Sequence, residues 1–149
     1  MAETLGSLCD KLTIVKLKLY HSDDKNRLKS LTNQEEQLKA EIDEYVANAF
    51  LGDISLDRLT FAANKVYKKK GNEIDRISGS IGSIFAKLAE VNCLLWHEQE
   101  KVYDFESVPP EFKNKVVKSL ALLNLERNEC MDGINRGLEQ LVRTSSSHQ

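Results

Sequence analysis

Two stretches of the chain carry the same pattern of apolar and polar positions, at a constant offset of 76 residues without a gap. Residues 4–25 read TLGSLCDKLTIVKLKLYHSDDK, and residues 80–101 read SIGSIFAKLAEVNCLLWHEQEK. Eight positions are identical, and Gly6/Gly82 is one of these pairs. An internal repeat of this kind predicts two copies of one structural unit.

In both copies, apolar residues recur three and four positions apart, which is the spacing of one face of an α-helix. In the first copy they are Leu5, Leu8, Leu12, Val15 and Leu19, and in the second Ile77, Ile81, Ile84, Leu88, Val91 and Leu95. The pattern predicts a helix over about residues 3–25 and another that begins as early as Asn72, where Asn-Glu-Ile-Asp offers an N-cap and an acidic first turn.

A further helical pattern follows each copy. After a polar turn at 22–26, apolar positions run from Leu28 to Ala49, and after the turn at 104–110 they run from Val116 to Leu141. Pro110 is well placed to begin the last helix. The segments 31–43 and 122–135 are also faintly similar, so the whole helical hairpin is duplicated.

Two amphipathic hairpins bury their apolar faces best by packing together, so the sequence predicts an all-α four-helix bundle with a long third helix. We expect one domain over 1–149. Its parts are a first hairpin (1–50), a crossover with a short helix near 55–58 (51–71), a second hairpin (72–143) and a disordered tail (144–149).

Composition limits the function classes. A net charge of −2 argues against a protein whose main task is to coat nucleic acid or an anionic membrane. The cysteines Cys9, Cys93 and Cys130 form no CxxC pair, which is typical of reduced thiols in a cytoplasm. With neither a signal-peptide pattern nor an apolar stretch of about 20 residues, the expected protein is cytoplasmic and has no membrane partner.

Charged residues interrupt the apolar faces of the second and fourth helices at Glu35 and Arg127. Such charges are costly to bury unless they are paired. His21 and His97 lie at equivalent positions near the ends of the first and third helices. If these helices are parallel, the polar groups gather toward one end of the bundle.

Three interpretations of this polar cluster stay open. In the first, it is structural: the histidines cap helix ends, and Glu35 pairs with Arg127 or a histidine. In the second, it binds a small anionic or sugar-like ligand. In the third, it binds a metal. The ligand-binding residues would be His21, Glu35, Asn92, His97, Asn124 and Arg127; the metal ligands would be His21, Asp24, His97 and Glu100.

The basic run Lys65, Lys68, Lys69 and Lys70, with Tyr67 beside it, could contact RNA, but it is short and isolated, and the sequence favours a solvated linker face. We find no nucleophile motif, phosphate loop or dinucleotide fingerprint, and no cofactor is expected. The sequence leaves enzymatic activity and any catalytic residues undetermined. Gly6 and Gly82 indicate close approach between helices.

Three segments of the chain resemble a family of small bacterial all-α proteins of unknown function. The segments are Asp10–His21 (DKLTIVKLKLYH), Val91–His97 (VNCLLWH) and Leu123–Asn135. The resemblance implies a helical bundle and an association with cell-envelope sugar genes, but no activity. The family motif positions fall on Asp10, Lys11, His21, Asn92, His97, Asn124 and Arg127. Lys16 departs from the pattern, which often has Asn there, and this argues against a strictly symmetric site.

Without a catalytic motif, the sequence favours an interaction or oligomeric module, with a homo-oligomer or another protein as the partner. The alternatives are the small-molecule or metal site at one end of the bundle and, as an outlier, RNA contact through the basic crossover.

Overall fold

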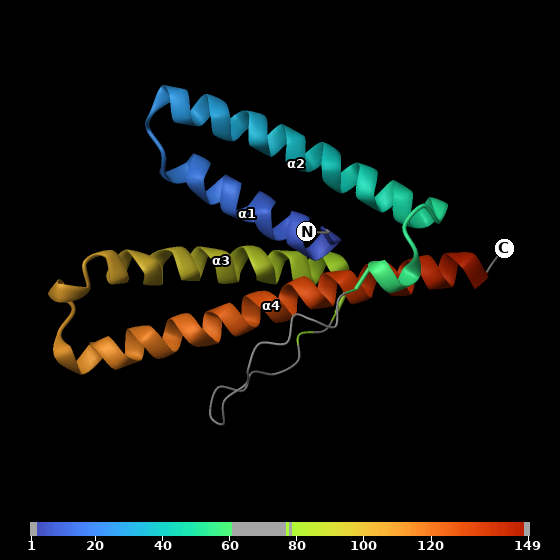
Figure 1. Ribbon diagram of the computed structural model, residues 1–149. Coiled ribbons are helices and arrows are strands. Elements are labelled where there is room, and N and C mark those ends of the chain that lie inside the picture. Colours follow the sequence, from blue (N-terminus) through green and yellow to red (C-terminus); the bar gives the residue numbers. More distant parts are fainter. Residues whose placement is uncertain (1–2, 61–76, 78, 148–149) are drawn as a thin grey trace.

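In the computed structural model, which describes residues 3–60, 77 and 79–147, the chain forms four α-helices and two short 3-10 helices (Figure 1). In chain order, these are α1 (Leu5–His21), α2 (Lys25–Leu51), η1 (Leu56–Arg58), α3 (Ile81–Tyr103), η2 (Phe105–Ser107) and α4 (Pro110–Ser147). The all-α prediction and the short helix in the crossover are therefore confirmed.

Local sequence explains where the helices begin. Thr4 and Ser7 form a capping box at the start of α1. Asp24 accepts hydrogen bonds from the backbone amides of Asn26 and Arg27 at the start of α2. α2 ends at Gly52, whose φ of 82° is the left-handed conformation that glycine tolerates.

Two predicted boundaries differ from the structure. The long third helix was expected from Asn72, but α3 begins at Ile81, because the Ser80 hydroxyl caps the amide of Ser83. Asn72 itself lies outside the described residues. The predicted disordered tail is also wrong over 144–147, since α4 continues to Ser147 and spans 38 residues.

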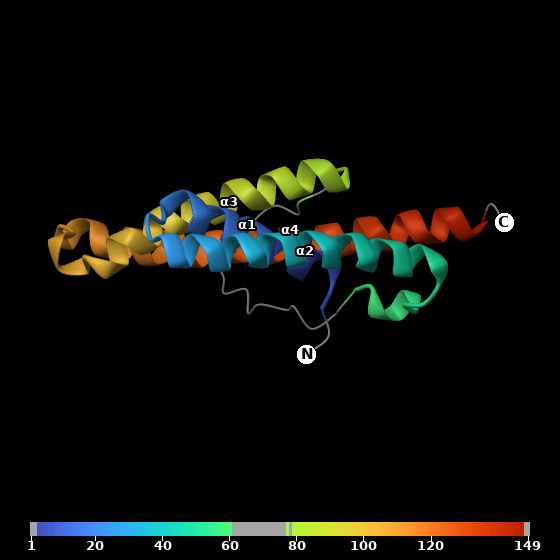
Figure 2. The same cartoon turned by 90° about the horizontal axis from the view of Figure 1, so that it is seen from above.

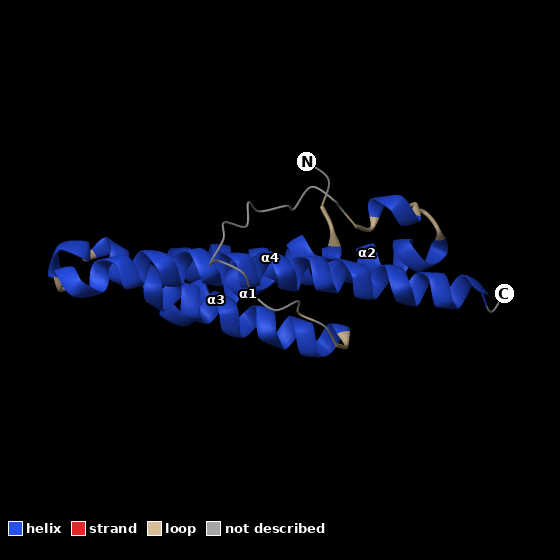
Figure 3. Cartoon of the chain, turned by 90° about the horizontal axis from the view of Figure 1, so that it is seen from below, coloured by secondary structure: helices blue, strands red, loops and turns tan. Residues whose placement is uncertain are grey.

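α1 occupies the centre of the molecule. It packs against α2, α3 and α4, and it runs parallel to α3, as the repeat implied (Figure 1). Seen from above and below, the first turns of α3 diverge from α4, whereas α2 overlaps α4 in both views (Figures 2 and 3). Within the described residues, α2 and α3 make little contact with each other, so the bundle is open between them.

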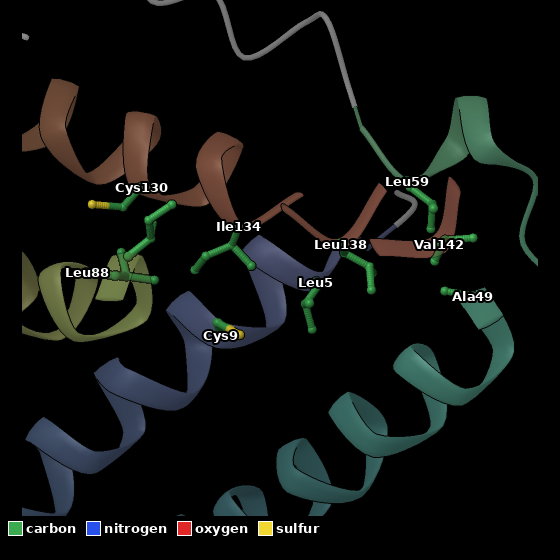
Figure 4. Packing of buried hydrophobic residues seen from close by; sticks show 10 residues of the cluster. Leu5, Cys9, Ala49, Leu59, Leu88, Cys130, Ile134, Leu138 and Val142 are labelled. Atoms are coloured by element: carbon green, nitrogen blue, oxygen red, sulfur yellow. The ribbon is translucent and has the colours of Figure 1, made fainter. Parts of the chain in front are cut away.

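The core lies where α1 crosses α4 (Figure 4). Ile134 and Leu138 of α4 and Leu88 of α3 are almost completely buried there beside Leu5 and Cys9 of α1. At the end of the crossing, Ala49 of α2 and Leu59 after η1 close the cluster with Val142 (Figure 4). This packing fixes α1 against the second hairpin.

The two equivalent glycines differ. A Cβ on Gly6 would overlap the backbone of Met131 on α4, and the Gly6 amide donates to Asn135 Oδ1 at 2.7 Å. Around Gly82 nothing lies within 4 Å of the Cβ position. The expected close approach is therefore confirmed for Gly6, whereas no described part of this chain approaches Gly82.

Candidate functional site

A buried polar cluster joins α1, α3 and α4. Arg127 Nε donates to Asp10 Oδ1 at 2.8 Å, and Arg127 Nη2 donates to Asp10 Oδ2 at 2.5 Å. Asn92 Nδ2 donates to Asp10 Oδ1 at 2.9 Å and to Thr13 Oγ1 at 2.7 Å. The Thr13 hydroxyl donates to the Asp10 carbonyl at 2.8 Å. The four residues thus form one connected network.

The network balances its own charge. Asp10 is 4% exposed, and the bidentate guanidinium supplies the neighbouring positive charge that a buried carboxylate needs. The hydrogen bonds to Asp10 raise the pKa of Arg127, so the guanidinium stays charged. Within the described residues, none of the four side chains has a buried N or O atom without a partner. The network is built as a structural lock between three helices.

This cluster contains two of the predicted ligand-binding residues, Asn92 and Arg127. The family resemblance also indicated Asp10, but the polar pattern along the helices had not singled it out, and Thr13 was missed. Thr13 lies three residues after Asp10, so both share one face of α1. An aspartate and a threonine three residues apart, beside apolar neighbours, were the feature of the sequence that could have predicted this buried polar cluster.

The histidines form a separate group at the end of α1. The His21 ring stacks on Trp96, with centroids 4.7 Å apart and an interplanar angle of 19°. The His97 ring lies edge-on to His21 at 6.4 Å. His21 is about 16 Å along α1 from Asp10, at 1.5 Å per residue. The single polar cluster expected from the sequence is therefore two clusters, because Arg127 and Asn92 bind Asp10 near the middle of α1 and not the histidines at its end.

The other predicted site residues have different surroundings. Glu35 pairs with Lys16 at 3.1 Å, so its expected pairing with Arg127 or a histidine is wrong. Asn124 is exposed on α4. The basic run 65–70, predicted as a possible RNA contact, lies outside the described residues.

The predicted metal ligands are not assembled as a ligand group. His97 Nδ1 lies 3.9 Å from Glu100, but the Asp24 carboxylate caps α2. Across 3–60, 77 and 79–147, no three or more His, Cys, Asp or Glu side chains are grouped so that they could hold a metal ion.

A second candidate surface lies on α3. Apolar residues occupy positions three and four apart on a face that the monomer leaves open, and we call this set the α3 stripe: Gly82, Ala86, Ala89, Cys93 and Trp96. The first three residues are exposed, and the last two are half-buried. The stripe is about 21 Å long at 1.5 Å per residue. α3 therefore has an apolar face in addition to the one that packs against α4 and α1.

The repeat identifies what this face does in the first copy. The equivalent positions on α1 are Gly6, Asp10, Thr13, Leu17 and Tyr20. Gly6 touches α4, Asp10 bonds to α4 and α3, and Thr13 bonds to α3. In α1, this face is thus a helix-packing surface. In α3, Gly82, Ala86 and Ala89 of this face are exposed, and no described residue lies within 4 Å of the Cβ position of Gly82, whereas Trp96 at the other end stacks on His21 of α1.

A groove of about 600 Å³ adjoins the α3 stripe, between α3, α1 and α2. Phe85 and Ala89 form its α3 side, and Leu12 and Leu17 form its α1 side. Lys16, Glu35 and Lys39 line it as well. The apolar stripe therefore continues into an apolar groove with charged residues beside it.

The three cysteines also differ in burial between α1 and the α3 stripe. Cys9 of α1 is buried, and burial raises the pKa of its thiol to about 12. Burial also raises the pKa of Cys130 to about 11. Both thiols are protonated and shielded at neutral pH. Cys93, in the α3 stripe, is only partly buried.

The fold and these surfaces define an all-α helical bundle with a locked polar centre and an uncovered apolar face on α3. In the described residues, no helix is both long and apolar enough to cross a membrane. Comparisons with protein-family models, curated proteins and solved structures found no match for this chain.

Proposed function

We propose that the protein is a homo-oligomeric interaction module whose α3 stripe packs against the α3 stripe of a second copy. The observation that carries the proposal is the difference between equivalent positions: Gly6, Asp10 and Thr13 of α1 are buried, whereas Gly82, Ala86 and Ala89 of α3 are exposed. Exposed apolar surface of this kind is typical of a protein interface.

The stripe is complementary to itself in size. In an antiparallel pair centred on Ala89, its only large residue, Trp96, lies over Gly82 of the partner subunit. Cys93 then lies within one residue of the level of Ala86 of the partner subunit, and the two Ala89 residues meet on the two-fold axis. Such an isologous contact closes as a dimer and forms no filament. Small residues at the centre let the two helices approach closely.

Charge favours the same register. The antiparallel pairing centred on Ala89 places Glu100, at the C-terminal end of the stripe, near the N-terminus of α3 of the partner subunit. A helix N-terminus carries a partial positive charge, which a carboxylate stabilises. Glu100 has a side chain 57% exposed and is free to make this contact when His97 is neutral. The two-fold axis repeats the interaction at both ends.

Cysteine crosslinking tests the register. In a Cys93→Ser background, Ala89→Cys places one thiol of each copy at the axis, and Ala40→Cys on the exposed side of α2 is the matched control. We expect a disulfide-linked dimer from the α3 variant under mild oxidation and little from the α2 variant, because a disulfide needs Cβ atoms about 4 Å apart. Equal crosslinking of the two variants would contradict the register.

Sedimentation equilibrium tests the association itself. We expect wild-type protein to form a dimer at micromolar concentration. Ala89→Arg should shift it to monomer, because a buried unpaired charge would occupy the axis. Ala40→Arg should leave the dimer intact. A wild-type monomer at high concentration would overturn the proposal.

A further inference from the structure

We infer that protonation of His21 and His97 weakens the proposed dimer, so that pH controls self-association; this inference rests on the proposed function. The two rings lie at the Trp96 end of the α3 stripe. In the proposed register, this end meets the N-terminus of α3 of the partner subunit. Histidine is the side chain that ordinarily changes charge between about pH 5 and 8.

The geometry of His21 holds its charge at the interface. Its Nδ1 lies 2.8 Å from the Leu17 carbonyl, so Nδ1–H is the donor and Nε2 is the atom that gains a proton. The ring stacks on Trp96, and an imidazolium over an indole face is further attracted by the ring electrons. Protonation therefore adds a positive charge that stays beside Trp96.

His97 lies beside Glu100, the carboxylate that favours the proposed dimer. Its Nδ1 lies 3.9 Å from Glu100 Oε2, so the protonated ring forms an ion pair with that carboxylate. The pair cancels the negative charge that would otherwise face the N-terminus of α3 of the partner subunit. One proton thus removes an attraction, and the proton on His21 adds a repulsion.

Other charged side chains surround the histidines. Lys18 of α1 and Arg27 of α2 line the same hollow as His21, together with Asp23 and Asp24 of the connecting turn. Near His97, Lys101 pairs with Glu98 on α3, and Asp104 and, from α4, Lys115 line the same hollow as His97. These acids and bases balance one another, which leaves the histidines as the groups that change the local charge.

The experiment measures the dimer dissociation constant by sedimentation equilibrium at about pH 7.5 and about pH 5.5 at one ionic strength. The variants are wild type, the double variant His21→Gln/His97→Gln and the control His148→Gln, which removes the remaining histidine. We expect the constant to rise about tenfold at the lower pH in wild type and control, and to change less than about twofold in the double variant.

Each outcome has a defined meaning. A wild-type dimer with the same dissociation constant at both pH values overturns the pH control and leaves self-association standing. An equal shift in the double variant overturns the role of these two histidines. A monomer at both pH values overturns self-association and the pH control with it. Circular dichroism of the exposed-residue variants confirms that each remains helical at both pH values.

Discussion

α1 and α3 have similar sequences over residues 4–25 and 80–101, yet the molecule uses the two helices differently. α1 is surrounded by three helices, and its Gly6, Asp10 and Thr13 face is buried. α3 has Gly82, Ala86 and Ala89 at the equivalent positions, and all three are exposed. The comparison teaches that a repeated apolar pattern specifies two similar helices, whereas a few polar residues decide which helix becomes central.

The asymmetry follows from the polar cluster. Asp10 can be buried only where a cation and a donor reach it, and Arg127 and Asn92 supply both from the second hairpin. Alanine at position 86 makes no such demand, and among the described residues α2 makes little contact with α3. A groove lined by α1, α2 and α3 lies beside this face.

The largest expected effect concerns the lock on α1. Arg127→Ala leaves the Asp10 carboxylate buried without its cation, and we expect a loss of about 3–5 kcal/mol in the free energy of unfolding. Urea denaturation measures it. The control is Arg143→Ala, which breaks an exposed pair with Glu139 on the same helix and should cost less than about 1 kcal/mol. Similar losses in both variants would show that the cluster is not a lock.

A direct comparison of the two copies comes from their glycines. Gly6→Ala forces a methyl group against the backbone of Met131, which cannot move without shifting α4, so we expect a loss of about 1–3 kcal/mol. Gly82→Ala meets nothing in the monomer and should change monomer stability by less than about 0.5 kcal/mol. Thermal unfolding of the two variants at low protein concentration separates them. Equal destabilisation would mean that Gly82 is packed as Gly6 is.

Position 16 of the first copy and position 92 of the second offer a smaller contrast. Asn92→Ala removes two buried hydrogen bonds, one to a carboxylate, and should cost about 2 kcal/mol. Lys16→Ala removes an exposed pair with Glu35 and should cost less than about 1 kcal/mol. Chemical denaturation of both variants checks the difference, and a larger effect at Lys16 would reverse our assignment of the buried site.

The sequence predicted the helices and their pairing because these depend on local periodicity. The repeat also predicted that α1 and α3 are parallel, which Figure 1 shows. The start of α3 was wrong because Asn72 and Ser80 are both good caps, and periodicity alone does not choose between them. The end of α4 was wrong because composition alone suggested a disordered tail at 144–147.

The site was harder to predict because it depends on pairs of residues far apart in the chain. Arg127 was recognised as a charge needing a partner, but the polar pattern indicated Glu35, whereas the partner in the structure is Asp10, 117 residues away. Placing His21 and Arg127 in one cluster assumed that polar residues gather at helix ends. In the structure, Arg127 instead pairs with the buried Asp10, and this pairing depends on how the helices pack in three dimensions.

The smallest perturbation is chemical labelling, which changes no residue. At about pH 8, the raised pKa values and burial of Cys9 and Cys130 keep these thiols protonated and shielded, so we expect a thiol reagent to label Cys93 first. Labelling of Cys93 should slow as protein concentration rises, because the proposed dimer would cover the α3 stripe. Mass spectrometry of digested samples identifies the labelled residue, and unfolded protein, in which all three cysteines react, is the control. A rate for Cys93 independent of concentration would place the interface elsewhere, and faster labelling of Cys9 would contradict the central position of α1.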